Sequence, residues 1–127
     1  IDWSQSARDI DALIRASTHP YSGAYSYLKV DNEIKKVYIW RSQIVSENTP
    51  DIGVPGHIIK NNHQTGEAWV LTGRGVIGII LVQYDGEEIF EPGKRWKSIR
   101  MRFGVDVESE LIILNNRLKK FIPHNQE

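Results

Sequence analysis

The segment Arg15-Ala-Ser-Thr-His-Pro-Tyr-Ser-Gly-Ala-Tyr-Ser-Tyr-Leu28 decides the fold, because it turns a short helix into the first strand of a β-rich body. Pro20 cannot continue a helix, and it biases the preceding His19 towards an extended backbone. Gly23 permits a sharp bend before the strand-like pattern begins. The chain is therefore expected to leave a helix and enter a sheet within these residues.

A short amphipathic helix precedes this segment. Ser6 and Asp9 have the spacing of a capping box at a helix start. The apolar side chains that follow at helical spacing are Ile10, Leu13 and Ile14. The polar side chains of the opposite face are Arg8, Asp9 and Asp11. The pattern predicts a surface helix over residues 7–16 with one buried stripe.

Short strands with glycine-rich turns fill the next part of the chain. The expected strands cover residues 24–30, 36–45, 57–60, 68–72, 76–84, 88–90 and 95–103. The run over 76–84 is apolar on both faces, which is typical of a central strand. The spacing predicts a mainly β fold, a small closed or partly open barrel of about six strands.

The last segment reads as a helix that needs a surface to pack on. An apolar stripe steps along it at intervals of four and three residues through Val107, Leu111, Leu114, Leu118 and Phe121. The stripe is expected to pack on the barrel wall or on a partner chain, because an isolated helix of this length is marginal in water. Leu111, Leu114 and Leu118 are therefore candidates for self-association.

Length and charge set limits on the function. The chain has 127 residues, with 16 basic and 16 acidic side chains and no cysteine. One domain is expected, divided into an entry helix and corner (1–23), a barrel (24–103) and a C-terminal helix (104–122). Zero net charge gives no general attraction to nucleic acid or an anionic membrane. No apolar run is long enough to span a membrane, and a cytoplasmic location is expected. Because the chain starts at Ile1 without methionine, we expect a fragment of a longer protein.

Basic side chains cluster near the end of the expected barrel. They are Lys94, Arg95, Lys97, Arg100 and Arg102. On a strand, they could contact phosphates in a groove. Alternatively, they form a solvated face neutralised by the acidic residues just before them, Asp85, Glu87, Glu88 and Glu91. The four histidines show no metal-ligand spacing, so no metal site is predicted.

The corner itself offers a second candidate site. Arg15, His19, Tyr21 and Tyr25 could contact another domain or a substrate. In the alternative interpretation Arg15 only closes its helix, and the tyrosines are half-buried barrel residues. The four tryptophans are expected to pack in the core or at its edge.

Several short motifs, in order, resemble the C-terminal domain of the methionyl-tRNA formyltransferase and sugar N-formyltransferase family. They are Ile1-Asp2-Trp3-Ser4, Arg15-Ala16, Pro20, Gly23-Ala24, Val37-Tyr38-Ile39-Trp40, Pro55-Gly56 and Thr72 to Gly75. The resemblance runs over roughly residues 1–86. It implies an open OB-like barrel that follows a Rossmann-like catalytic domain, which transfers a formyl group from 10-formyltetrahydrofolate to an amine. The family's catalytic asparagine, histidine and aspartate have no counterparts here, so no catalysis and no cofactor are expected in this chain alone.

The resemblance also suggests how this domain would work. Arg15, His19, Pro20, Tyr21 and Gly23 are expected at the interface with the catalytic domain of the same parent chain, or in contact with the acceptor. The acceptor could be an amino sugar or aminoacyl-tRNA. The neutral charge of the chain disfavours tRNA. The segment after Gly86 also differs from the pattern of the tRNA formyltransferases, which disfavours tRNA as well. A homodimer is a further expectation.

The alternative is a free-standing OB-like module. It would bind single-stranded nucleic acid through Lys94 to Arg102 and nearby aromatic residues.

Overall fold

The computed structural model describes residues 1–30, 32–48, 53–97, 100–104, 112 and 115–118. The named elements are α1 (Ala7–Ser17), β1 (Ala24–Val30), β2 (Glu33–Ser46), β3 (Ile58–Asn61), β4 (Ala68–Leu71), β5 (Val76–Tyr84), β6 (Ile89–Phe90), α2 (Pro92–Arg95) and β7 (Met101–Phe103). The expected first strand and the expected central strand have the predicted bounds.

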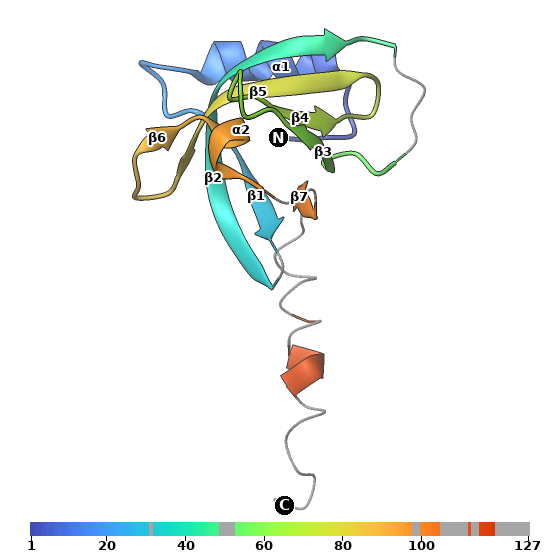
Figure 1. Ribbon diagram of the computed structural model, residues 1–127, viewed down its shortest axis with the longest axis vertical. Helices are drawn as coiled ribbons and strands as arrows, with labels where there is room; N and C mark the ends of the chain where they lie inside the picture. The colour runs from blue at the N-terminus through green and yellow to red at the C-terminus, as the bar shows by residue number, and fades with distance from the viewer. Residues whose placement is uncertain (31, 49–52, 98–99, 105–111, 113–114, 119–127) are drawn as a thin grey trace, which may run out of the picture.

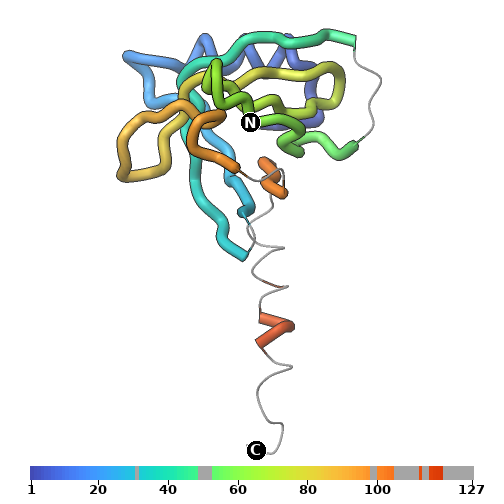
Figure 2. Tube along the Cα trace, in the orientation of Figure 1, coloured from blue at the N-terminus to red at the C-terminus, as the bar shows by residue number. Residues whose placement is uncertain are grey.

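Six antiparallel strands form a nearly closed barrel. Their order is β3-β4-β5-β2-β1-β7, and β6 pairs with β5 outside this path. The two ends meet, because His57 bridges Arg102 and the Phe103 backbone nitrogen donates to the Gly56 carbonyl at 2.8 Å. Figure 2 shows the orange β7 trace beside the green β3 trace. The predicted mainly β barrel of about six strands is confirmed.

The long strand β2 connects the two halves of the barrel. Its first part pairs with β1, from Glu33 to Ile39, and its later part pairs with β5, from Val37 to Ser46. The register with β5 shifts at three points between Ile39 and Ser46. Such irregularities bend a strand and increase its twist. They let one strand curve around the barrel.

Aromatic side chains close one part of the core. The buried rings of Trp3 and Phe103 stack with their centroids 5.0 Å apart. The Trp3 indole donates to the Ser26 hydroxyl at 2.9 Å, so its one polar atom is satisfied inside the protein. Trp3 therefore fixes the N-terminal segment to the barrel.

Helix α1 covers the outside of β2 and β5 (Figure 1). Its cap is the predicted one, because the Ser6 hydroxyl accepts from the Asp9 nitrogen at 3.1 Å. Ile10 and Ile14 are buried as expected. Asp11 is also buried, and the prediction that it lies on the polar face is wrong.

The structure does not show the single strand that was expected over residues 95–103. Residues Pro92–Arg95 form the short helix α2, and Met101–Phe103 pairs with β1 as strand β7. Proline favours the first positions of a helix, where its missing N–H leaves no bond unmade. The basic residues of this segment therefore do not share one strand.

The expected C-terminal helix is described only in part. Ile112 and residues 115–118 are helical. Ile112 is 60% exposed and Leu118 58%, so these two side chains do not pack on the barrel wall. Leu111 and Leu114 lie outside the described residues, and their proposed part in self-association stays a prediction.

Candidate functional site

The helix-to-strand corner is held to the barrel by Trp40 on β2. The Thr18 hydroxyl donates to the Trp40 carbonyl at 3.0 Å. The imidazole of His19 stacks on the Trp40 ring, with centroids 4.0 Å apart and planes 6° apart. A Cβ atom at Gly23 would lie only 2.8 Å from the Trp40 ring. Glycine is needed here because the backbone lies against the indole.

Trp40 is in turn fixed from the other side. Its indole nitrogen donates to the Gln83 side-chain carbonyl at 2.9 Å, and the Gln83 amide donates to the Glu87 carbonyl at 2.6 Å. The corner, the middle of β2 and the β5–β6 hairpin are therefore joined by one indole ring.

A row of aromatic rings continues from Trp40 along the outer face of β1 and β2. We call it the aromatic band, and its members are His19, Tyr25, Tyr27, Tyr38 and Trp40. Tyr38 lies 6.1 Å from Trp40 and 6.2 Å from Tyr25, between ring centroids. Tyr27 meets Tyr25 edge-on at 6.2 Å. Such offset and edge-on contacts are the favourable geometries for aromatic pairs.

One cation lies on the aromatic band. The Lys36 ammonium is 4.4 Å from the Tyr25 ring centroid and 5.1 Å from that of Tyr38. A hydrogen bond with the Tyr38 side chain is the main reason why the pKa of Lys36 is raised. The positively charged ammonium and the two ring faces attract one another.

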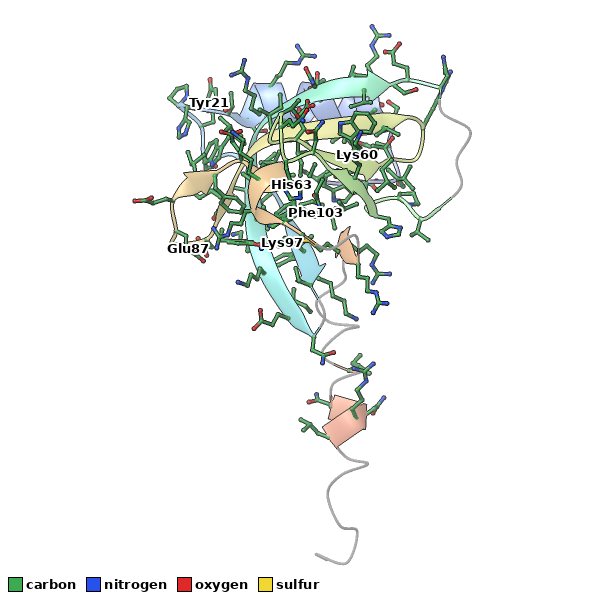
Figure 3. The ribbon with its side chains drawn as sticks, viewed as in Figure 1. Tyr21, Lys60, His63, Glu87, Lys97 and Phe103 are labelled. Atoms are coloured by element: carbon green, nitrogen blue, oxygen red, sulfur yellow. The ribbon has the colours of Figure 1, made fainter. Side chains whose placement is uncertain are left out.

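Much of this surface is open to a partner. Tyr25 is 45% exposed, and Tyr21 on the adjoining corner is 67% exposed. Figure 3 shows Tyr21 at the upper left of the view, whereas Lys60 of β3 lies to the right. Large exposed aromatic side chains are enriched at protein interfaces.

The sequence did not point to Tyr38, Trp40 or Lys36 as members of this surface. The missing signal was strand register: β1 ends at Val30 and β2 begins at Glu33. This tight connection places Tyr25 opposite Tyr38 and Tyr27 opposite Lys36. If the sequence analysis had assumed a hairpin with a two-residue loop, it would have predicted these pairs.

Arg15 lies on the corner but faces its own helix. Its Nε donates to the buried Asp11 carboxylate at 2.9 Å, and the Ser42 hydroxyl donates to the other carboxylate oxygen at 2.7 Å. Asp11 thus connects α1 to β2.

Asp11→Ala is expected to lower the free energy of unfolding by about 1–3 kcal/mol, because the Ser42 hydroxyl loses a charged acceptor. Arg15→Ala should cost no more than about 0.5 kcal/mol, because the Arg15 side chain is mostly exposed and the ion pair is screened. Urea denaturation of both variants checks this difference. Equal losses would show that the carboxylate has no structural role beyond its pair with Arg15.

The predicted phosphate-contact residues are not brought together on one strand. Lys94 pairs with Glu91 at 3.2 Å, and Arg95 lies 3.6 Å from Glu87. Lys97 is exposed after α2, whereas Arg100 and Arg102 are exposed before and within β7. Lys94 and Arg95 are thus partly neutralised by nearby acids.

The described part of the chain contains no group of three histidine, cysteine, aspartate or glutamate side chains that could hold a metal ion. Within the same residues, no helix has the length and apolar character needed to cross a bilayer.

Several motif residues that are far apart in the sequence are in contact in the structure. The Gly73 nitrogen donates to the carbonyls of Trp3 and Gln5, both at 2.9 Å. Gly56 lies at the seam where Phe103 closes the barrel. These motif residues thus hold together segments that are far apart in the sequence.

Comparison with known proteins gives the family. Residues 1–100 match the family described as "Formyl transferase, C-terminal domain". A methionyl-tRNA formyltransferase from Protochlamydia amoebophila is 32% identical over 88 residues, which cover 69% of this chain and 26% of that protein. One from Polynucleobacter asymbioticus is 30% identical over 117 residues, or 92% of this chain and 32% of that protein. The bifunctional polymyxin resistance protein ArnA from Wigglesworthia glossinidia brevipalpis is 48% identical over 62 residues, or 49% of this chain and 8% of that protein.

The similarity extends past residue 86, where the sequence analysis expected it to end. The chain spans no more than 32% of the length of these relatives. On the match over residues 1–100, the chain belongs to the formyl transferase C-terminal domain family.

Proposed function

We propose that this chain is the accessory C-terminal domain of a formyltransferase that uses 10-formyltetrahydrofolate. The barrel packs on a catalytic domain of the same parent chain and helps to position an amine acceptor. Formyl transfer and folate binding belong to that catalytic domain, and the proposed location is the cytoplasm. Family membership and the small share of each relative that the chain spans support this proposal.

The observation that carries the docking part is the aromatic band beside the corner. Tyr25 of the band and Tyr21 of the corner are exposed rings, and Trp40 joins the band to the corner. The nitrogen of Ile1 donates to the Tyr25 carbonyl at 3.0 Å. A domain that precedes Ile1 in a parent chain would therefore be attached beside this surface.

Docking is tested in the full-length parent protein with Tyr21→Asp and Tyr25→Asp. Each variant puts a charge where an aromatic ring would be desolvated, so we expect kcat/KM for formyl transfer to fall about tenfold or more. The radius of gyration from small-angle scattering should rise as the domains separate. Ile59→Asp on β3 is the matched control, because Ile59 is 40% exposed and lies outside the band.

The outcomes separate two claims. If the band variants behave like Ile59→Asp in both measurements, the aromatic band is not the docking surface. If the unchanged full-length protein transfers no formyl group to any amine acceptor, the transferase proposal itself fails.

The acceptor is tested with the same protein. An amino sugar carried on a nucleotide and a methionyl-tRNA are offered separately with 10-formyltetrahydrofolate. The zero formal charge of this chain favours the smaller acceptor, because tRNA binding depends strongly on lysine and arginine contacts to phosphates. The two methionyl-tRNA formyltransferases among the relatives keep tRNA as the other acceptor to test.

A single-stranded nucleic-acid module is the second candidate, and the aromatic band is the feature that favours it. Stacked rings can bind bases without sequence preference. Binding with a steep salt dependence, lost in Tyr25→Asp, would support this function. No binding of oligonucleotides at low salt would remove it.

A further inference from the structure

A cavity of about 380 Å³ opens at one end of the barrel, where β1 ends and β2 begins. Its size falls within the range of small-molecule sites, about 300–1,000 Å³, and the mouths of β-barrels are preferred places for such sites. The cavity and the aromatic band lie on opposite faces of β2. Lys35, which lines the cavity, points to the inner face of this strand, and Lys36 points to the outer face.

Three cations from separate segments line this cavity. Lys35 comes from β2, Arg95 from the end of α2, and Lys97 from the residues that follow. Among the described residues of the lining, Glu33 is the acidic member, so three cations accompany one carboxylate there.

Two of these cations converge on one ring. The Lys35 ammonium lies 4.6 Å from the Tyr84 ring centroid, and the Arg95 guanidinium lies 5.0 Å from it. Arg95 is also 4.4 Å from the Phe90 ring centroid, and its Nη2 is 3.6 Å from a Glu87 carboxylate oxygen. These contacts fix the guanidinium. An anion placed between Lys35 and Arg95 would reduce the repulsion between these two cations.

Two aromatic side chains belong to the lining of the cavity. Tyr84 and Trp96 are both buried, and the Trp96 indole donates to the Tyr84 hydroxyl oxygen at 2.9 Å. The cavity therefore combines the edges of two buried aromatic side chains with three cations.

From this arrangement we infer that the barrel mouth binds an aromatic phosphate, with the ring beside Trp96 and the phosphate among Lys35, Arg95 and Lys97. This inference goes beyond the proposed function, because it assigns a ligand to the barrel itself and does not depend on formyl transfer.

The test uses the 127-residue chain and three probes: 1-naphthyl phosphate, 1-naphthol and inorganic phosphate. Calorimetry should show binding of 1-naphthyl phosphate at least about tenfold tighter than that of either part, because only this probe uses the aromatic side chains and the cations together. In nuclear magnetic resonance spectra, the indole N–H signal of Trp96 should shift, whereas that of Trp69 on β4 should not.

Lys35→Gln and Lys97→Gln are each expected to weaken binding of 1-naphthyl phosphate about tenfold. Lys60→Gln is the matched control, because its ammonium also lies over a ring, 4.8 Å from the Trp69 centroid, but outside the cavity. Thermal melting of each variant verifies its fold.

If 1-naphthyl phosphate does not bind at concentrations up to about 10 mM, its dissociation constant is too high for a specific site, and the inference is overturned. Equal binding of 1-naphthol also overturns it, because the cations would then play no part. Equal losses in Lys60→Gln and Lys35→Gln would show a general charge effect and no site at the barrel mouth.

Discussion

Phe103→Ala is expected to lower the free energy of unfolding by about 3–5 kcal/mol, the range for removal of a fully buried aromatic ring. Phe103 is among the largest fully buried side chains, and its ring lies 5.0 Å from Trp3 and 6.0 Å from Trp96, between centroids. Its backbone also closes the barrel through the bond to Gly56. The void left by the missing Phe103 ring would lie next to the seam between Phe103 and Gly56. Guanidinium denaturation measures the loss.

The neighbouring Arg102 provides the control for Phe103. It lies on the same short strand with its side chain exposed, and its replacement by alanine should cost no more than about 1 kcal/mol. If the two variants lost the same stability, the effect would belong to the strand and not to the buried ring.

Gly73→Ala is expected to cost at least about 3 kcal/mol. A Cβ atom at this position would lie 1.7 Å from the Ser4 carbonyl oxygen, and backbone cannot move aside as a flexible side chain does. The N-terminal segment would have to separate from the turn. Both bonds from the Gly73 nitrogen, to Trp3 and to Gln5, would then be broken. The loss is measured by the same denaturation experiment.

Gly86→Ala separates crowding from backbone strain. Gly86 has a positive φ of 80° but no atom within 4 Å of an added Cβ, so alanine there should cost only about 1–2 kcal/mol. A loss at Gly73 no larger than that at Gly86 would contradict the packing explanation.

These predictions explain what the family motifs do in this chain. Gly73 meets the segment around Trp3, and Gly23 meets Trp40. Residues of the motifs on which the resemblance rests thus make contacts between segments that are far apart in the sequence. They identify the fold of the domain more directly than they identify any chemistry.

Local patterns predicted the elements that depend on local physics. The cap at Ser6, the strand Ala24–Val30 and the apolar strand Val76–Tyr84 follow from capping, alternation and burial on both faces. The basic segment was misjudged because Pro92 begins a helix turn as readily as it ends a strand. Asp11 was misjudged because its hydroxyl partner, Ser42, lies on another element.

The candidate surfaces required knowledge that local patterns do not contain. The aromatic band depends on the register between β1 and β2, and the cavity combines cations from β2 and from the α2 region. No local pattern specifies which residues of distant segments will meet. The corner was predicted as an interface from its resemblance, and its role in docking stays a prediction.

Strand β2 has a consequence for how this domain can change in evolution. Lys35 faces the barrel mouth, whereas Lys36, Tyr38 and Trp40 face the opposite side. Residues Lys35 to Trp40 thus alternate between the inner side of the barrel and the aromatic band. Substitutions can alter one surface and leave the other intact, but inserting or deleting a single residue before Lys35 would exchange the two faces. The length of the β1–β2 connection is therefore under a stricter constraint than its composition.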